Sequence, residues 1–532
     1  MADAIAQELV AAGIDRAFGL PGGEVLPLID ALRRNGIQFV LCRHEADAGL
    51  MAAVYGKLSG RPGVAIATLG PGASNLMLPI ANSLLDREPL LAISAQIPSS
   101  WSPLRTHQRL PLIDVFSPIT KGAVAITAEN CRTAVREMLT VSGTEPAGPT
   151  YLTITSEISR EIASVSPRAT SSRPRGLSLL KLSPPDLAAR EVRSRLGASK
   201  KPVLAIGIGV KWADAPLLRR WISSWQLPVT VTPKAKGIVD ERDPLFAGVI
   251  SGMAIDRTMV GGMSNADLVI GLGLDPSEID GDWHERFPML WMLESRWATE
   301  AVPINGLVAC DLSELLTILM HEPPPTLWLD PMTEARAERN LVMQMPTGSN
   351  GFLSPLGSVR ALASAFPDDA IVTTDVGSHK YLFGQFWPST SPGTFFMSNG
   401  LSGMGYGLPA AIAAKLARPN QTVLAVLGDG GFSMNSQELE TAKRYGLGFV
   451  VAVMADSSYS MIRIGQRRQG FERYGVDFEP IDSVLTAQAC GVRGVRVADE
   501  SELADCAREA AARSEITVIE IPIRADDYTP II

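Results

Sequence analysis

The feature that most constrains the fold of this 532-residue chain is an acidic residue placed among glycines directly after a buried strand. Residues 422–427 form a short apolar run rich in β-branched side chains, and Gly-Asp-Gly-Gly (428–431) follows it. A second apolar run, 449–454, begins one helix length later, which is the spacing of a βαβ unit. The sequence therefore predicts an open α/β sheet whose ligand site lies at the carboxyl ends of these strands.

Each of these two strands is followed by a carboxylate, Asp429 after the first and Asp456 after the second. If the strands are neighbours, both acids reach one ion, and a diphosphate, a backbone carbonyl and water would complete the octahedral shell of Mg²⁺. Glycines let the backbone approach a phosphate closely, and the N-terminus of a helix expected over 433–445 favours its charge. Taken alone, a Gly-Asp-Gly turn is equally compatible with a tight turn that binds nothing.

The same alternation of short apolar runs and helical segments recurs along the chain. We expect three doubly wound parallel-sheet α/β domains, over 1–163, 186–320 and 350–532. Between the first two, the stretch 164–185 is rich in Ser, Pro and Arg without periodicity, which predicts a surface linker.

Charge and cysteine content limit the classes of partner. The 48 Lys and Arg residues against 56 Asp and Glu give a net charge of −8, which argues against a surface that coats nucleic acid. No apolar run approaches the ~18 residues of a membrane span, and the first residues do not resemble a signal peptide. Five dispersed cysteines without a CxxC pair are typical of reduced thiols. We therefore expect a cytoplasmic protein that binds neither nucleic acid nor membrane.

The N-terminal part of the chain contains a second group of candidate residues. Glu45 follows a short apolar strand and precedes the helical run 46–58, where an acid is most often a solvated helix-start residue. Turns rich in Gly and Pro occur at 19–23 and at 68–75, the latter after a buried strand.

These motifs, taken in chain order, resemble those of the thiamine diphosphate-dependent enzymes, nearest to the acetolactate synthase and pyruvate oxidase group. The motifs are Phe18-Gly-Leu-Pro-Gly-Gly, Arg43-His-Glu45, Thr68-Leu-Gly-Pro-Gly-Ala-Ser-Asn75, Asp375-Val-Gly-Ser-His379, Gly400-Leu-Ser-Gly-Met404-Gly-Tyr-Gly-Leu-Pro, and Gly428-Asp-Gly-Gly-Phe through Asp456. The resemblance implies that the first domain binds the aminopyrimidine ring of the cofactor, and that the third binds its diphosphate together with Mg²⁺.

The resemblance also implies a role for each matching residue. Glu45 matches the catalytic glutamate that hydrogen-bonds N1′ of the aminopyrimidine and so promotes removal of the thiazolium C2 proton, and Gln108 aligns with a glutamine near the reacting carbon. Met404 matches the apolar residue that holds the cofactor bent, and the carbonyl of Ser402 accepts from its 4′-amino group. The other expected cofactor-binding residues are Thr68, Pro71, Asn75, Gly377, Ser378, His379, Gly403, Gly428, Asp429, Gly430, Gly431, Asp456, Ser458, Tyr459, Ser460 and Met461. The expected metal ligands are Asp429, Asp456 and Ser458.

Several positions depart from the family pattern. Asp456 stands where the metal ligand is usually Asn, and we expect binding to survive the change. The Arg-Phe-Asp-Asp-Arg stretch that binds the second oxo acid in acetolactate synthases is replaced here by 272–278. Gly465 replaces a tryptophan that forms a wall of the substrate pocket in the family. These changes favour a bulkier substrate or a different acceptor. The central domain keeps Gly-Ile-Gly at 207–209 but lacks the family's Asp-Ile-Asp-Pro segment, so we expect no FAD.

The resemblance implies decarboxylation of a pyruvate-like 2-oxo acid, with carboligation of the resulting carbanion to a carbonyl acceptor. The alternatives are a decarboxylase that releases an aldehyde and a non-catalytic paralogue that only binds the cofactor; the presence of Glu45 argues against the second. A nicotinamide-dependent oxidoreductase is disfavoured because 207–209 lacks the full GxGxxG spacing. Because the family assembles each site between subunits, we expect a homodimer or homotetramer.

Overall fold

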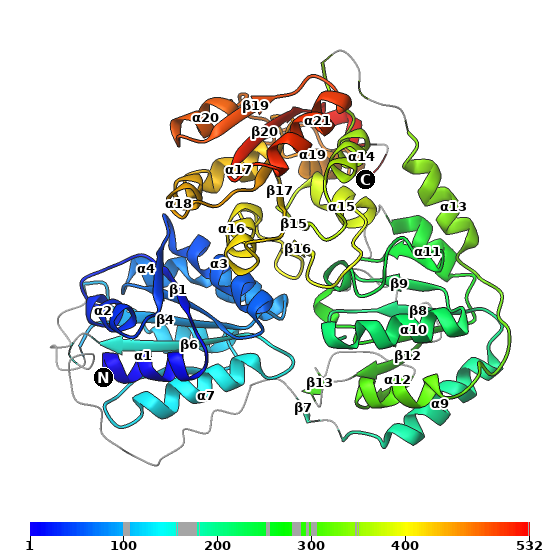
Figure 1. The fold of residues 1–532 in the computed structure, drawn as a ribbon, viewed down its shortest axis with the longest axis horizontal. Coiled ribbons are helices and arrows are strands. Elements are labelled where there is room, and N and C mark those ends of the chain that lie inside the picture. The colour runs from blue at the N-terminus through cyan, green and yellow to red at the C-terminus, as the bar shows by residue number, and fades with distance from the viewer. Residues whose placement is uncertain are drawn as a thin grey trace. The chain divides into compact units, whose positions relative to one another are not determined.

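The computed structural model of the chain describes residues 1–98, 107–155, 157, 178–179, 181–251, 256–278, 289–293, 297–298, 306–345, 348, 351–529 and 531. Three six-stranded parallel sheets organise these residues (Figure 1), which confirms the predicted fold class. A separate short antiparallel sheet consists of β7 (Ser178–Leu179) and β13 (Trp297–Ala298). Most of the linker expected over 164–185 falls outside the described residues.

The N-terminal sheet has the strand order β2-β1-β3-β4-β6-β5. β3 and β4 are buried almost throughout, as expected for parallel strands covered by helices on both faces. The strands are β1 (Arg16–Gly19), β2 (Gln38–Leu41), β3 (Gly63–Ala67), β4 (Leu90–Gln96), β5 (Ala123–Ala125) and β6 (Pro149–Thr155). The helices are α1 (Ala2–Ala11), α2 (Leu26–Arg34), α3 (Glu45–Ser59), α4 (Pro71–Asn75), α5 (Met77–Leu85), α6 (Leu112–Phe116) and α7 (Cys131–Gly143).

The central sheet has the order β10-β9-β8-β11-β12-β14, so the chain builds outward on one side of β8 and then crosses to the other. The point between β8 and β11 is therefore a topological switch point. The strands are β8 (Pro202–Ile206), β9 (Val229–Val231), β10 (Phe246–Val249), β11 (Leu268–Leu272), β12 (Met289–Leu293) and β14 (Leu307–Ala309). The helices are α9 (Pro185–Ala198), α10 (Ala215–Trp225), α11 (Arg257–Met263), α12 (Leu312–Met320) and α13 (Thr333–Val342).

The C-terminal sheet has the order β16-β15-β17-β18-β20-β19. The strands are β15 (Ile371–Thr374), β16 (Phe395–Met397), β17 (Val423–Gly428), β18 (Val450–Ala455), β19 (Arg493–Arg496) and β20 (Thr517–Pro522). The helices are α14 (Pro355–Ala365), α15 (Ser378–Phe386), α16 (Gly407–Ala417), α17 (Asp429–Asn435), α18 (Glu438–Arg444), α19 (Ser460–Arg468), α20 (Ser483–Ala489) and α21 (Glu500–Ala511).

Two predictions about this sheet have different outcomes. β17 and β18 are direct neighbours, with Leu424 opposite Val450, so their adjacency is confirmed. The single helix expected over 433–445 is wrong, because α17 already begins at Asp429 and the chain breaks before α18. At the break, the side chain of Asn435 donates to the carbonyl of Gly405 at 2.6 Å, a contact between distant segments that local periodicity does not reveal.

The chain divides into two compact units. The first unit comprises 1–176, 400–420 and 435–447, and within it α16 packs against α3. The second unit comprises 177–399, 421–434 and 448–532. Among the described helices, none combines the length and apolar character that crossing a membrane requires.

Candidate functional site

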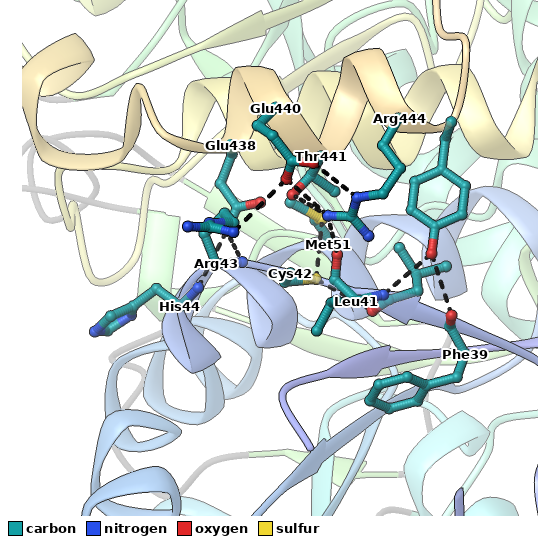
Figure 2. Close-up of polar contacts among 12 residues, drawn as sticks. Phe39, Leu41, Cys42, Arg43, His44, Met51, Glu438, Glu440, Thr441 and Arg444 are labelled. Carbon is teal, nitrogen blue, oxygen red and sulfur yellow. Dashed lines mark hydrogen bonds and ion pairs between the residues drawn. The ribbon is translucent and has the colours of Figure 1, made fainter. Parts of the chain in front are cut away.

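The turn between β2 and α3 places Glu45 at the first position of α3. A second acid, Glu438, holds this turn through hydrogen bonds (Figure 2). Glu438 of α18 accepts the backbone N–H of Arg43 at 2.7 Å and that of His44 at 3.2 Å. His44 caps α3, since its Nδ1 accepts the N–H of Ala46 at 3.1 Å. Glu438 is fully buried, and burial raises the pKa of its carboxyl. The position of Glu45 therefore depends on a residue almost four hundred positions away in the chain.

α18 also covers the free edge of β2, the outermost strand of the N-terminal sheet. The guanidinium of Arg444 donates to the carbonyl of Leu41 at 2.9 Å. The hydroxyl of Tyr445 accepts the N–H of Leu41 at 3.1 Å and donates to the carbonyl of Phe39 at 3.2 Å. These side chains satisfy backbone groups that an uncovered edge strand would expose.

Glu45 is itself buried, with 8% of its surface exposed, and lies against the predicted turn 68–75. The side-chain amide of Asn75 donates to its Oε2 at 2.9 Å. A Cβ atom on Gly72 would lie 3.1 Å from its Oε1, so the glycine places no side chain against this second oxygen. Thr68 also lies beside Gly72, and its hydroxyl donates to Glu24 at 2.7 Å. Sequence reasoning missed Glu24, although it directly follows the Gly-Gly of the first motif.

Two more predicted residues adjoin this turn. Gln108 adopts a left-handed backbone conformation, with φ of 59°, and its Cβ would lie 2.9 Å from a Cβ placed on Gly70. Pro71 occupies the first turn of α4, where a missing N–H costs nothing. The first unit thus brings together Glu45, Asn75, Thr68, Pro71 and Gln108.

The predicted loop 402–404 also belongs to the first unit. The N–H of Gly400 donates to the buried carboxylate of Asp86 at 2.7 Å, which anchors the start of the loop. Ser402 has a left-handed φ of 52°, and Met404 is half-buried. Nothing in the local sequence pointed to Asp86, because its partner lies more than three hundred residues away.

In the second unit, Asp429 and Asp456 end the adjacent strands β17 and β18. Asp429 accepts the N–H of Gly430 on Oδ1 at 2.9 Å and that of Ser457 on Oδ2 at 2.7 Å. Asp456 accepts the N–H of Ser458 at 3.0 Å and the hydroxyl of Ser460 at 2.6 Å. Burial raises the pKa of Asp429, and burial together with the charge of Asp429 raises the pKa of Asp456 to about 7. The two buried carboxylates therefore repel one another, and a cation bound between them would stabilise their charged forms.

His379 and Ser378 lie at the carboxyl end of β15, the neighbour of β17. Both side chains are buried, and neither His379 Nε2 nor Ser378 Oγ has a hydrogen-bond partner within the described structure. Burial lowers the pKa of His379 to about 4, so the imidazole is neutral at physiological pH. Buried polar atoms are rarely left unpaired, and two such atoms at one strand end point to a ligand that supplies partners.

The predicted glycines lie close around these side chains. A Cβ on Gly377 would lie 2.7 Å from Cε1 of His379, and one on Gly428 would lie 3.2 Å from the same atom. A Cβ on Gly430 would lie 2.8 Å from the ring of Tyr459, and one on Gly431 only 2.2 Å from a carboxylate oxygen of Asp375. Side chains at these positions would force the strand ends apart, so the tight packing here requires glycine.

The remaining predicted residues follow Asp456. Ser458 is buried and its hydroxyl donates to the carbonyl of Val476 at 3.2 Å, while Tyr459 is 38% exposed and contacts the ring of Phe478 in a tilted arrangement. Met461 packs against the hydrophobic core of the C-terminal sheet. A Cβ on Gly465, one helical turn further along α19, would meet no atom within 4 Å. In the described part of the chain, no group of three or more His, Cys, Asp or Glu side chains gathers as a metal site.

Comparison with known proteins gives three family matches in chain order. The descriptions are thiamine pyrophosphate enzyme, N-terminal TPP binding domain, over 1–116; central domain, over 189–289; and C-terminal TPP binding domain, over 375–521. The chain is 30% identical to the acetolactate synthase isozyme 2 large subunit of Escherichia coli, covering 94% of this chain and 91% of the relative. It is 29% identical to the acetolactate synthase of Bacillus subtilis, covering 99% and 93% respectively. It is also 29% identical to the acetolactate synthase large subunit of Lactococcus lactis, covering 98% and 92%.

Proposed function

The chain belongs to the thiamine pyrophosphate enzymes of the acetolactate synthase group, and from this premise we propose that it decarboxylates a pyruvate-like 2-oxo acid and joins the remaining acyl unit to a carbonyl acceptor. The observation that carries the proposal is the buried Glu45, whose Oε2 accepts the amide of Asn75 while its Oε1 lies beside Gly72, which has no side chain. When bound, thiamine diphosphate supplies the electron sink that this carbon–carbon chemistry requires.

The diphosphate half of the site is assigned to the second unit. We propose that Asp429, Asp456 and the backbone carbonyl of Ser458 hold Mg²⁺, with phosphate oxygens and water completing its shell. The unpaired atoms of Ser378 and His379 are suited to phosphate oxygens if His379 donates through Nε2. The close glycines keep this strand end free of side chains that would obstruct the phosphates. The residues present thus fit a metal-bound diphosphate.

The aminopyrimidine half is assigned to the first unit. We propose that Oε1 of Glu45 shares a proton with the ring, while the amide of Asn75 keeps the carboxylate oriented. Gln108 would orient the reacting substrate from beside Gly70, and Met404 and the carbonyl of Ser402 would position the cofactor. These assignments rest on the match to the family motifs and on the contacts described above.

Product analysis tests the proposed reaction against the aldehyde-releasing alternative. Pyruvate alone, and then pyruvate with an added aldehyde or second 2-oxo acid, should be incubated with the protein, thiamine diphosphate and Mg²⁺. We expect acyloin or acetohydroxy-acid products, whereas free aldehyde as the main product would favour the alternative. The open space beside Gly465 and the absence of the family's Arg-rich clamp over 272–278 make larger donors and acceptors a necessary part of the panel.

We propose that the active enzyme is a cytoplasmic homodimer or homotetramer in which each site takes its aminopyrimidine half from one chain and its diphosphate half from another. Mixing two inactive variants, Glu45→Gln and Asp429→Asn, tests this arrangement. A mixed dimer would then contain one site with both substitutions and one with neither, so refolding the variants together should restore part of the activity. Activity that stays at the level of the separate variants would place each site within a single chain.

A further prediction concerns Glu438, which fixes the turn that carries Glu45. Glu438→Ala leaves the N–H groups of Arg43 and His44 without their buried acceptor, at a cost of about 0.5–1.5 kcal/mol for each hydrogen bond lost. We expect a lower melting temperature and a lower kcat with KM little changed. The control is Glu440→Ala on the same helix, whose exposed ion pair with Arg444 contributes about 0.3–0.5 kcal/mol. Equal effects of the two substitutions would contradict a positioning role for Glu438.

A further inference from the structure

The central sheet has the strand order of a dinucleotide-binding fold, in which a cofactor such as FAD or NAD lies at the carboxyl ends of the strands beside the switch point. Its phosphates would bind to backbone N–H groups of the first turn, here 207–210, and to the N-terminus of the helix that follows. FAD in particular is a cofactor that the family implies. The contacts of this turn decide whether the chain offers such a site.

Every backbone N–H from Gly207 to Val210 already has an acceptor within the chain. Gly207 donates to the carbonyl of Leu272 at 2.9 Å, Gly209 to that of Gly273 at 2.8 Å, and Val210 back to Gly207 at 3.2 Å. Ile208 donates to Oε2 of Glu278 at 2.8 Å. No N–H of the turn is left to bind a phosphate.

The glycines of the turn serve to pack two strand ends together. A Cβ on Gly207 would lie 2.5 Å from the carbonyl oxygen of Gly273, and one on Gly209 would lie 2.8 Å from it. A Cβ on Gly273, whose φ is +60°, would lie 2.6 Å from the backbone of Gly209. The loop after β8 therefore lies directly on the loop after β11, where a dinucleotide would have to enter.

The side chain of Glu278 adds hydrogen bonds between the loops at this end of the central sheet. Glu278 ends a short 3₁₀ turn (Pro276–Glu278) after β11 and is 3% exposed. Its Oε1 accepts the hydroxyl of Thr232 at 2.7 Å and the N–H of Lys234 at 3.1 Å, both from the loop after β9. With Ile208 on its other oxygen, this carboxylate links the loop after β11, which carries it, to the loops after β8 and β9 across the switch point. It thus receives the hydrogen bonds that a bound anion would receive there.

The start of the following helix is also occupied by an acid. Asp214 directly precedes α10, is 5% exposed, and accepts a hydrogen bond from the hydroxyl of Ser313. A buried carboxylate at a helix N-terminus uses the favourable end of the helix dipole and repels a second anion. The N–H groups of the first turn are therefore already paired within the chain, and a buried carboxylate stands at the start of the helix that follows.

We propose that the carboxylate of Glu278 occupies the dinucleotide crevice of the central sheet, so that this enzyme works with neither FAD nor a nicotinamide dinucleotide bound there. This inference goes beyond the proposed reaction and does not depend on it. The FAD of the family has no place among these residues, because the donors and the space it needs are already taken.

Chemical rescue of Glu278→Ala provides the test. The variant should melt at a lower temperature than the wild type, because three donors lose their acceptor. Added formate or acetate should restore part of the loss by entering the vacated position, whereas chloride at the same ionic strength should not. Glu278→Gln, which retains one carbonyl oxygen, should be less destabilised and should not respond to formate.

Titration of the intact wild-type protein with FAD and with NAD⁺ provides the second readout. We expect no saturable binding of either and no visible flavin absorbance in the purified protein. Saturable FAD binding by the wild type would overturn the inference, as would a Glu278→Ala variant whose stability is unchanged or equally restored by chloride. If Glu278→Ala does not fold, Glu278→Gln and the wild-type titration still decide the question, and neither readout requires catalytic activity.

Discussion

Replacing Glu45 by Gln is expected to lower turnover by about 10²–10⁴-fold while thiamine diphosphate still binds. The substituted side chain has nearly the same shape, and its carbonyl oxygen can still accept the amide of Asn75. Its NH₂ group would then occupy the position of Oε1, where it cannot exchange a proton with the aminopyrimidine ring. Binding should survive because the diphosphate contacts are assigned to other residues.

The measurement compares kcat for 2-oxo acid decarboxylation with the affinity for thiamine diphosphate in the same preparation. Glu440→Gln, an acid-to-amide change in α18 at a side chain that is 42% exposed, is the matched control and should retain activity. Comparable turnover by Glu45→Gln and the wild type would refute the assigned role. Loss of cofactor affinity in parallel with kcat would instead indicate that Glu45 mainly supports binding.

The second large effect is expected from Asp429→Asn, which should weaken Mg²⁺-dependent cofactor binding by at least about 100-fold. Both oxygens of Asp429 accept backbone N–H groups, from Gly430 and Ser457. An asparagine must turn its NH₂ group towards one of these donors, so it loses a hydrogen bond and displaces the loop. The substitution also removes a negative charge from the proposed metal site.

The same substitution at Asp456 is expected to leave binding largely intact. One oxygen of Asp456 accepts the N–H of Ser458 and the other accepts the hydroxyl of Ser460. An asparagine can keep the first contact and donate to the second, because a hydroxyl can also accept. Removing one of two adjacent carboxylates also relieves the repulsion that helps to raise the pKa of Asp456. Equilibrium dialysis of the cofactor with Mg²⁺, and with EDTA as the metal-free reference, distinguishes the two variants. Abolished binding in Asp456→Asn with normal binding in Asp429→Asn would reverse the assignment.

The buried strands were predictable because their apolar runs are short, continuous and bounded by glycine-containing turns. The runs 422–427 and 449–454 became β17 and β18, and the Gly-rich turn between them carries Asp429 as expected. The helix after Asp429 was mispredicted because its break depends on packing against segments distant in the chain. Local periodicity indicates where an element can form, but not which tertiary contact ends it.

The residues that support the site could not be found in the same way. Glu438 and Asp86 each fix a predicted motif by accepting backbone N–H groups from segments several hundred residues away. Neither belongs to a motif, so the sequence offered no signal for them. The stretch 272–278 did stand out as a departure from the family, yet only the structure shows that Glu278 turns inward to join the loops after β8 and β9.

Isothermal titration calorimetry of thiamine diphosphate into the wild-type protein, with and without Mg²⁺, tests the central claim most directly. The proposed site predicts saturable binding in the presence of Mg²⁺ and a large loss of affinity when the metal is removed, because the diphosphate would be held chiefly through the ion between Asp429 and Asp456. An absence of binding heat at any cofactor concentration with Mg²⁺ present, or an affinity that does not change with the metal, would contradict the claim.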